Sequence, residues 1–98
     1  MRYEPAESPA QLYHGISPTA VAEIVSVGGL RAMARQYVHL TTDRVMAVRT
    51  GRRKTLVPQV LVIDAVVTHR AGVLFYPSSD LVWLAEDVPI AFIEGLRP

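Results

Sequence analysis

The stretch VPQVLVIDAVV, Val57 to Val67, is the most apolar run of this 98-residue chain and decides its fold class. Its β-branched part, from about Val60 to Ile63, predicts a central strand. Asp64 follows directly and can cap a short turn that ends at Gly72. The other elements are therefore expected to pack around this strand.

Before it, the chain predicts a short strand and then a helix. QLYHG, residues 11–15, is typical of a strand, and SPTAVAEIVSVGG of a helix. Ser17 is the expected N-cap, Pro18 the first helical residue, and Gly28 with Gly29 the end of the helix. The apolar face of this helix is predicted to consist of Val21, Ile24 and Val25.

A second strand and a second helix follow an expected turn at Leu30. QYVHLTTD has the two-residue period of a half-buried strand. Thr42 with Asp43 can cap a helix that runs towards Gly51. The alternation assigns one face of the strand to Tyr37, His39 and Thr41, and the core face to Val38 and Leu40.

The C-terminal part predicts three further short strands, VLFYP, LVWLA and IAFIEGL, separated by the turns SSD and EDVP. Helices early and strands late favour an α+β domain over alternating βαβ units. At this length, residues 1–98 are expected to form a single domain. Residues 1–10 are polar and rich in proline, and we expect them to form an extended arm.

Composition excludes several classes of protein. Half of the residues are apolar and 19% are charged, and no apolar run approaches the roughly 20 residues of a membrane span. The chain has no cysteine and no secretory leader pattern, so we expect a cytoplasmic protein without disulfides. The net charge is only +1, but five cations lie within eleven residues, at Arg44, Arg49, Arg52, Arg53 and Lys54.

Three histidines are the main candidates for chemistry: His14 and His39 on predicted strands, and His69 in a turn. No closely spaced set of metal ligands accompanies them, and the chain has neither a GxSxG nucleophile motif nor a phosphate loop. Taken alone, His14 is most simply a buried histidine bonded to a backbone carbonyl. The strand histidines, the arginines and Gly15 could also hold a polyanionic ligand.

Seven sequence blocks resemble one family. They are LYHG (12–15), GL (29–30), RQYVHLTTD (35–43), VLVIDA (60–65), FYPSSD (75–80), VWL (82–84) and VPIAFI (88–93). In this order and spacing they resemble the NAD-binding half of the KptA-type RNA 2′-phosphotransferases, a branch of the ADP-ribosyltransferase superfamily.

The resemblance implies a fold and a reaction. The fold is an α+β domain with two or three short helices and two small, split antiparallel sheets that hold NAD⁺ in a cleft between them. No metal is expected. In the family, the RNA 2′-phosphate attacks the nicotinamide ribose C1″ and expels nicotinamide. The ribose 2″-hydroxyl then attacks the phosphorus, which leaves a 2′-hydroxyl RNA and ADP-ribose 1″,2″-cyclic phosphate. The protein positions NAD⁺ and stabilises charge.

The resemblance also assigns NAD-binding residues. His14 is expected to contact the NAD ribose and the backbone of Gly15 to hold the nicotinamide amide, since glycine permits close backbone approach. His39 matches the histidine of the second motif, and Ser78 lies in a loop that contributes to the pocket. Val82 falls where other ADP-ribosyltransferases carry a catalytic Glu, which argues against ordinary protein-directed transfer.

Arginines are expected to bind the substrate phosphate. Arg35 matches the arginine before the second strand. Arg52 or Arg53 matches another after the second helix, and the sequence does not choose between them. The predicted catalytic set is His14, Arg35, His39 and Arg52.

Two departures leave the acceptor open. Ile16 stands where the family commonly has Thr, and only 13 residues precede His14, where the family has an RNA-binding lobe. The alternatives are a stand-alone, toxin-like ADP-ribosyltransferase that modifies a nucleic acid, small molecule or protein, and a non-catalytic module that binds NAD or ADP-ribose. Expected partners are NAD⁺, a phosphorylated RNA, and a separate N-lobe or an antitoxin protein.

Overall fold

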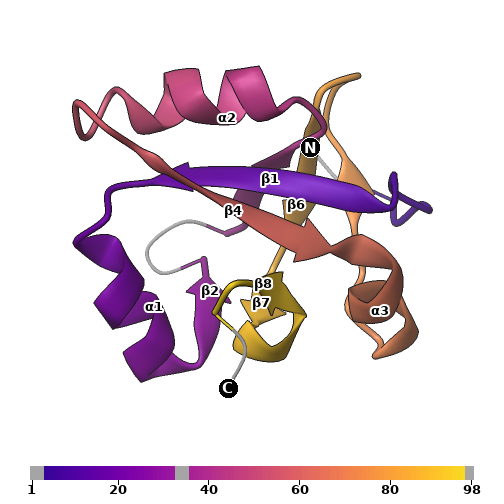
Figure 1. Ribbon diagram of the computed structural model, residues 1–98. Coiled ribbons are helices and arrows are strands. Elements are labelled where there is room, and N and C mark those ends of the chain that lie inside the picture. The colour runs from indigo at the N-terminus through magenta and orange to yellow at the C-terminus, as the bar shows by residue number, and fades with distance from the viewer. Residues whose placement is uncertain (1–3, 33–35, 97–98) are drawn as a thin grey trace.

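The apolar run forms β4 (Gln59–Asp64), which is hydrogen-bonded on both sides as predicted for a central strand. Along one edge it pairs antiparallel with all six residues of β1 (Gln11–Ile16), and along the other with β8 (Ile93–Glu94). Two-sided pairing satisfies the backbone N–H and C=O groups that burial removes from water. This strand pair forms the middle of the computed structural model, which describes residues 4–32 and 36–96 (Figure 1).

The α+β prediction is confirmed, because residues 4–32 and 36–96 form three helices and two antiparallel sheets. The larger sheet has the strand order β5-β6-β3-β1-β4-β8, and the smaller one consists of β2 and β7. The remaining elements, in chain order, are α1 (Ala20–Val27), β2 (Gly29–Arg31), β3 (Val38–Thr41), α2 (Arg44–Gly51), α3 (Ala65–Arg70), β5 (Tyr76–Pro77), β6 (Val82–Ala85), β7 (Asp87–Pro89) and the 3-10 turn η1 (Ile90–Phe92).

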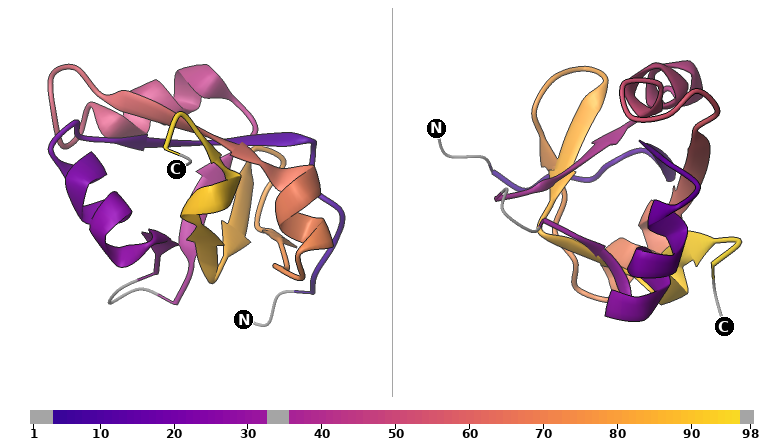
Figure 2. Two further views of the ribbon diagram at one scale, coloured as in Figure 1. Left: turned by 60° about the horizontal axis from the view of Figure 1, so that its bottom comes forward. Right: turned by 90° about the vertical axis from the view of Figure 1, so that its left-hand side faces the viewer.

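The helices cover different parts of the large sheet. In Figure 1, α2 runs along β1 and β4, whereas α1 and α3 lie at opposite ends of this strand pair, an arrangement also seen in the left view of Figure 2. The core lies between the large sheet, the flanking helices and the β2–β7 ribbon. Its fully buried large side chains are Leu12, Leu40, Leu61, Ile63, Phe75, Val88 and Ile93.

Helix α2 begins where the sequence predicts and packs closely on β1. The Asp43 carboxylate caps it by accepting a hydrogen bond from the Val45 N–H at 2.9 Å. A Cβ on Gly15 would lie only 1.9 Å from the carbonyl oxygen of Ala47. Only glycine at position 15 therefore lets the α2 backbone come this close to the strand.

The first helix begins later than predicted. Thr19 occupies the N-cap position of α1, and the Ala20 N–H donates to the carbonyl of Ser17 at 3.0 Å, which closes a turn before the helix. Ser17 as N-cap and Pro18 as the first helical residue were therefore wrong. The predicted apolar face was wrong at Val25, which is 50% exposed.

A second antiparallel sheet agrees with the predicted split sheets, but its two strands were not located from the sequence. The expected turn at Leu30 lies within β2, and the expected EDVP turn contains β7, with Leu30 paired to Val88. A Cβ on Gly29 would lie 2.1 Å from the carbonyl oxygen of Val88, so these strands also approach at a glycine. Three-residue strands are too short to show a two-residue period.

The predicted C-terminal strands are shorter than expected. Of VLFYP, only Tyr76–Pro77 is paired, and IAFIEGL divides into η1 and the two-residue β8. The expected turn after Asp64 is the helix α3, whose Val67 N–H donates to the Asp64 carboxylate at 3.2 Å. Neither α3 nor any other helix within 4–32 and 36–96 has the length and apolarity needed to span a bilayer.

Candidate functional site

The site lies where two neighbouring strands of the large sheet separate. β1 stays paired with β4 along its whole length, but its ladder with β3 contains a single pair, Tyr13 with Thr41. Beyond this pair, His14 Nδ1 lies 2.8 Å from the carbonyl oxygen of His39. A side chain thus bridges the two strands where their backbone ladder ends, and a cleft opens beside it.

Two adjoining hollows form this cleft, with volumes of about 240 and 310 Å³. The end of α2 contributes to both, because the Arg53 N–H donates to the carbonyl of Thr50 at 3.3 Å and so holds the chain against the helix. The two hollows share five lining residues, namely His14, Gly15, His39, Thr50 and Arg53.

The smaller hollow has a largely apolar wall, and we call it the apolar hollow. Leu40 from β3, Met46 and Ala47 from α2, and Val82 from β6 contribute to it. The Thr41 hydroxyl lies 3.4 Å from the sulfur of Met46 and so ties β3 to α2. A pocket with apolar walls and a few fixed polar groups is typical of a site for a flat organic ring.

The larger hollow is basic, and we call it the basic hollow. Arg31 from β2 lines it together with Arg53 and Lys54, which follow α2. Of the residues in 4–32 and 36–96, eleven line it and none of these is Asp or Glu. Concentrated positive charge without a local carboxylate attracts phosphate groups.

The bond between His14 and His39 determines which nitrogen of the His14 ring faces the cleft. A backbone carbonyl can only accept, so His14 Nδ1 carries the proton and donates it to the His39 oxygen. In the neutral ring, Nε2 is then a hydrogen-bond acceptor. Because His14 lines both hollows, this acceptor is available to a hydroxyl group of a ligand.

Burial lowers the pKa of His14 below its usual value of 6.5. The positive charge of Lys54 and that of protonated His39 lower it further, against the bond to the His39 carbonyl, which favours the charged ring. His14 is therefore neutral near pH 7 and keeps the acceptor on Nε2.

This pKa predicts an acid-sensitive contribution to stability. The unfolded chain, with the higher pKa, takes up the proton first as the pH falls. The contribution of His14 to the free energy of unfolding should therefore decrease below about pH 6.5 and level off below the folded-state pKa. Urea titrations of the wild type and His14→Asn at several pH values measure this contribution, as a difference in the free energy of unfolding that changes with pH. A difference that stays constant with pH would contradict the lowered pKa.

The structure locates most of the residues predicted for the site. His14, Gly15 and His39 line both hollows, and Val82 lines the apolar hollow. Ser78 lies in the exposed loop between β5 and β6 and lines neither hollow. The prediction for Arg35 falls outside the described residues.

Arg52 and Arg53, between which the sequence did not choose, occupy different positions relative to the cleft. Arg53 lines both hollows, whereas Arg52 lines neither and is exposed at the end of α2. Arg31, Lys54 and Thr50 also line the cleft, but none of them was predicted as a site residue. The cluster of cations after the second helix could have indicated Lys54 as a site residue. No sequence pattern relates Arg31 to that cluster.

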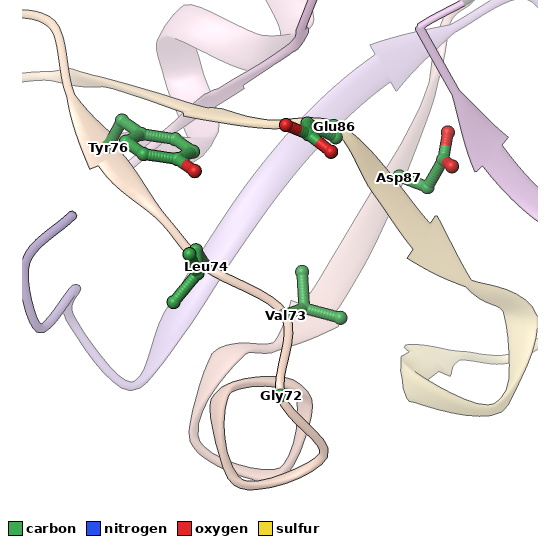
Figure 3. A pocket seen from close by; sticks show the side chains of 6 residues that line it. All are labelled: Gly72, Val73, Leu74, Tyr76, Glu86 and Asp87. Atoms are coloured by element: carbon green, nitrogen blue, oxygen red, sulfur yellow. The ribbon is translucent and has the colours of Figure 1, made fainter. Parts of the chain in front are cut away.

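A third hollow, of about 270 Å³, lies elsewhere and shares no lining residue with the cleft. Figure 3 shows that its lining comes from two segments, one leading from α3 into β5 and one leading from β6 into β7. Its polar side chains are Tyr76, Glu86 and Asp87, so its charge is opposite to that of the basic hollow. Among residues 4–32 and 36–96, no group of three or more His, Cys, Asp or Glu could hold a metal ion.

Fold and site together define an α+β domain with a basic cleft between two diverging strands, suited to a phosphate-bearing ligand. The family model for the RNA 2′-phosphotransferases, Tpt1 / KptA family, matches residues 1–87. The chain belongs to this family, whose members use NAD⁺.

Curated relatives support the assignment. A probable RNA 2′-phosphotransferase of Streptomyces griseus is 48% identical and is matched over 91% of this chain and 46% of its own length. Proteins of the same name from Pectobacterium carotovorum and Streptomyces coelicolor are 42% and 40% identical, over 97% and 100% of this chain and 50% and 53% of their own lengths. The chain thus spans about half the length of the curated relatives it matches.

Proposed function

We propose that this chain is an NAD⁺-dependent transferase that moves the 2′-phosphate of an RNA to the ADP-ribose part of NAD⁺. The observation that carries the proposal is the meeting of His14 from β1, His39 from β3 and Arg53 from the turn after α2 around one cleft. Membership of the RNA 2′-phosphotransferase family supports the same reaction.

The lining residues fit NAD⁺. The apolar hollow suits a nicotinamide ring. Nε2 of the neutral His14 ring can accept a hydrogen bond from a ribose hydroxyl group, and Arg53 can bind phosphate oxygens. When bound, NAD⁺ supplies the ribose carbon that accepts the phosphate and nicotinamide as the leaving group.

The chain's own task is positioning and charge stabilisation, because the nucleophile belongs to the acceptor. Arg53 would hold the 2′-phosphate beside the ribose and spread its negative charge. His14, fixed by the His39 carbonyl, would orient the ribose. Val82 lines the apolar hollow and carries no carboxylate that could act as a general base. A neutral side chain needs such a base before it can attack the ribose carbon, whereas a phosphate group is already charged. A phosphate is therefore the better nucleophile for this site.

Incubation with NAD⁺ and an oligonucleotide that carries one 2′-phosphate tests the function. We expect release of nicotinamide together with ADP-ribose cyclic phosphate and a 2′-hydroxyl oligonucleotide. Arg49→Gln should leave the rate unchanged, because Arg49 is exposed and lines neither hollow. A stable ADP-ribosylated oligonucleotide would indicate the alternative transferase, and NAD⁺ binding without nicotinamide release would indicate a non-catalytic module.

Arg53 is the family arginine in this proposal, and a matched pair of variants tests it. Arg53→Gln should raise KM for the phosphorylated oligonucleotide roughly tenfold or more, because a charge-assisted bond to phosphate is lost. Arg52→Gln removes the same charge one residue away and should change KM less than about twofold. Steady-state kinetics with both variants would reject the assignment if Arg52→Gln had the larger effect.

A further inference from the structure

Two large apolar side chains are almost fully exposed in the loop that joins α2 to β4. Leu56 is 93% exposed and Val57 is 74% exposed, the two highest values among the exposed large hydrophobic residues of 4–32 and 36–96. The loop turns at one edge of the molecule, beyond the end of α2 (Figure 1). We call this pair the apolar tip. Adjacent apolar side chains that are left in water are stabilised when a partner covers them.

The backbone on both sides holds the apolar tip in its exposed position. Before the tip, the carbonyl of Gly51 accepts hydrogen bonds from the N–H groups of Lys54 at 3.0 Å and Thr55 at 3.2 Å. After the tip, Pro58 returns to Gly51, since a Cβ on Gly51 would lie 2.5 Å from the Cβ of Pro58. The loop is therefore closed at its base, and a tip held in this way loses little conformational entropy when a partner binds.

The apolar tip lies beside the cations of the cleft. Arg53 lines both hollows and Lys54 lines the basic hollow. Leu56 follows Lys54 by two residues, so their Cα atoms are at most about 7 Å apart. Residues 44–63 contain five Lys or Arg and no Asp or Glu. A partner that covers the tip also meets this positive charge, which favours an anionic partner.

A single strand of RNA combines the two properties that the tip and its surroundings require. Its phosphates are anionic, and each unpaired base has a flat face that a side chain can cover. Apolar side chains such as leucine also insert between neighbouring bases of nucleic acids and separate them. In the proposed reaction Arg53 holds the 2′-phosphate of the acceptor, so the bases beside that phosphate come within reach of the tip.

We propose that the apolar tip contacts the bases of the acceptor RNA, with Leu56 and Val57 packed against the face of an unpaired base next to the phosphorylated nucleotide. Phosphate contacts hold the strand, and the tip adds an apolar contact that does not depend on the identity of the base. This inference rests on the proposed function and extends acceptor recognition to a loop outside the two hollows. The tip should contribute to affinity for the acceptor and not to NAD⁺ binding.

Fluorescence anisotropy with two oligonucleotides tests this contact without turnover. Both carry one 2′-phosphate and equal numbers of phosphodiesters, but in the second every nucleotide except the phosphorylated one is abasic. We expect the wild type to bind the abasic oligonucleotide roughly tenfold more weakly, because the apolar contact is lost. Leu56→Ser should lose most of this preference, and Leu56→Met should keep it, because methionine provides a similar apolar surface.

Val57→Ser and Val45→Ser are a matched pair of variants. Val45 is 59% exposed but lies at the start of α2 and lines neither hollow. Val57→Ser should reduce the preference for bases, whereas Val45→Ser should leave it unchanged. Thermal unfolding should change little in these variants and in Leu56→Ser, since the replaced side chains are exposed. Leu56→Ser should also keep the wild-type slope of log affinity against log salt concentration, because an apolar contact releases no counterion.

Four results would overturn the proposal. The first is a wild type that binds the two oligonucleotides equally or not at all, and the second is an unchanged preference in Leu56→Ser. The third is a loss of NAD⁺ affinity in Leu56→Ser as large as its loss of oligonucleotide affinity, which would assign the tip to the cofactor. The fourth is self-association of the wild type in sedimentation velocity that Leu56→Ser abolishes, which would make the tip a contact between copies of this chain. Failure of the transferase itself would appear separately, as absent nicotinamide release by a wild type that still prefers the base-bearing oligonucleotide.

Discussion

Gly15→Ala is expected to destabilise the domain by about 3 kcal/mol or more, a large part of the roughly 5–15 kcal/mol typical of a small domain. The added methyl carbon would lie 1.9 Å from the carbonyl oxygen of Ala47, and that oxygen belongs to a helix backbone that cannot rotate away. Thermal unfolding followed by circular dichroism measures the effect. The cleft should be lost as well, because α2 carries Thr50 and the turn with Arg53.

Gly72→Ala is the matched control. Gly72 has φ of 101°, but a Cβ there would meet nothing within 4 Å. Its substitution should therefore cost only the left-handed backbone strain, roughly 1–2 kcal/mol. If Gly15→Ala costs no more than Gly72→Ala, the contact between β1 and α2 is not what requires glycine at position 15.

His14→Asn is expected to reduce kcat/KM for the proposed reaction roughly a hundredfold, by removing a group that orients the ribose. The asparagine amide can still donate to the His39 carbonyl in place of Nδ1, but nothing replaces Nε2. Stability should therefore change little while nicotinamide release falls. Thermal unfolding followed by circular dichroism and steady-state kinetics of nicotinamide release measure the two effects separately.

His14→Ala is the companion variant. It removes both the cleft-facing nitrogen and the bond to the His39 carbonyl, which lies 2.8 Å away in the wild type. It should lose the same activity as His14→Asn and additional stability, about 1 kcal/mol for one hydrogen bond. Wild-type turnover by His14→Asn would show that His14 only joins the strands.

Long periodic segments and helix caps could be predicted from the sequence. The alternation around Val38 and Leu40 identified the core face of β3, and both side chains are buried. Asp43 and Asp64 both cap helices, because a carboxylate satisfies N–H groups within three residues of itself. Such signals are local, so they do not depend on the rest of the fold.

Short elements defined by distant partners could not be predicted. β2 exists because Gly29, Leu30 and Arg31 pair with a segment near the C-terminus, and the sequence around Leu30 indicates only a turn. Ser17 has the composition of an N-cap, yet a turn through Pro18 moves the start of α1 past it. In both places tertiary contacts override the local preference.

By itself, the sequence determined the α+β class, the central strand, the caps at Asp43 and Asp64, and the resemblance that pointed to His14, His39 and an arginine after the second helix. Only the tertiary structure distinguished Arg53 from Arg52, oriented the His14 ring and joined Arg31 to Lys54 in one basic hollow. The reason is physical. Periodicity and capping act over a few residues, whereas the cleft depends on where β1 and β3 stop pairing and on how closely α2 approaches Gly15.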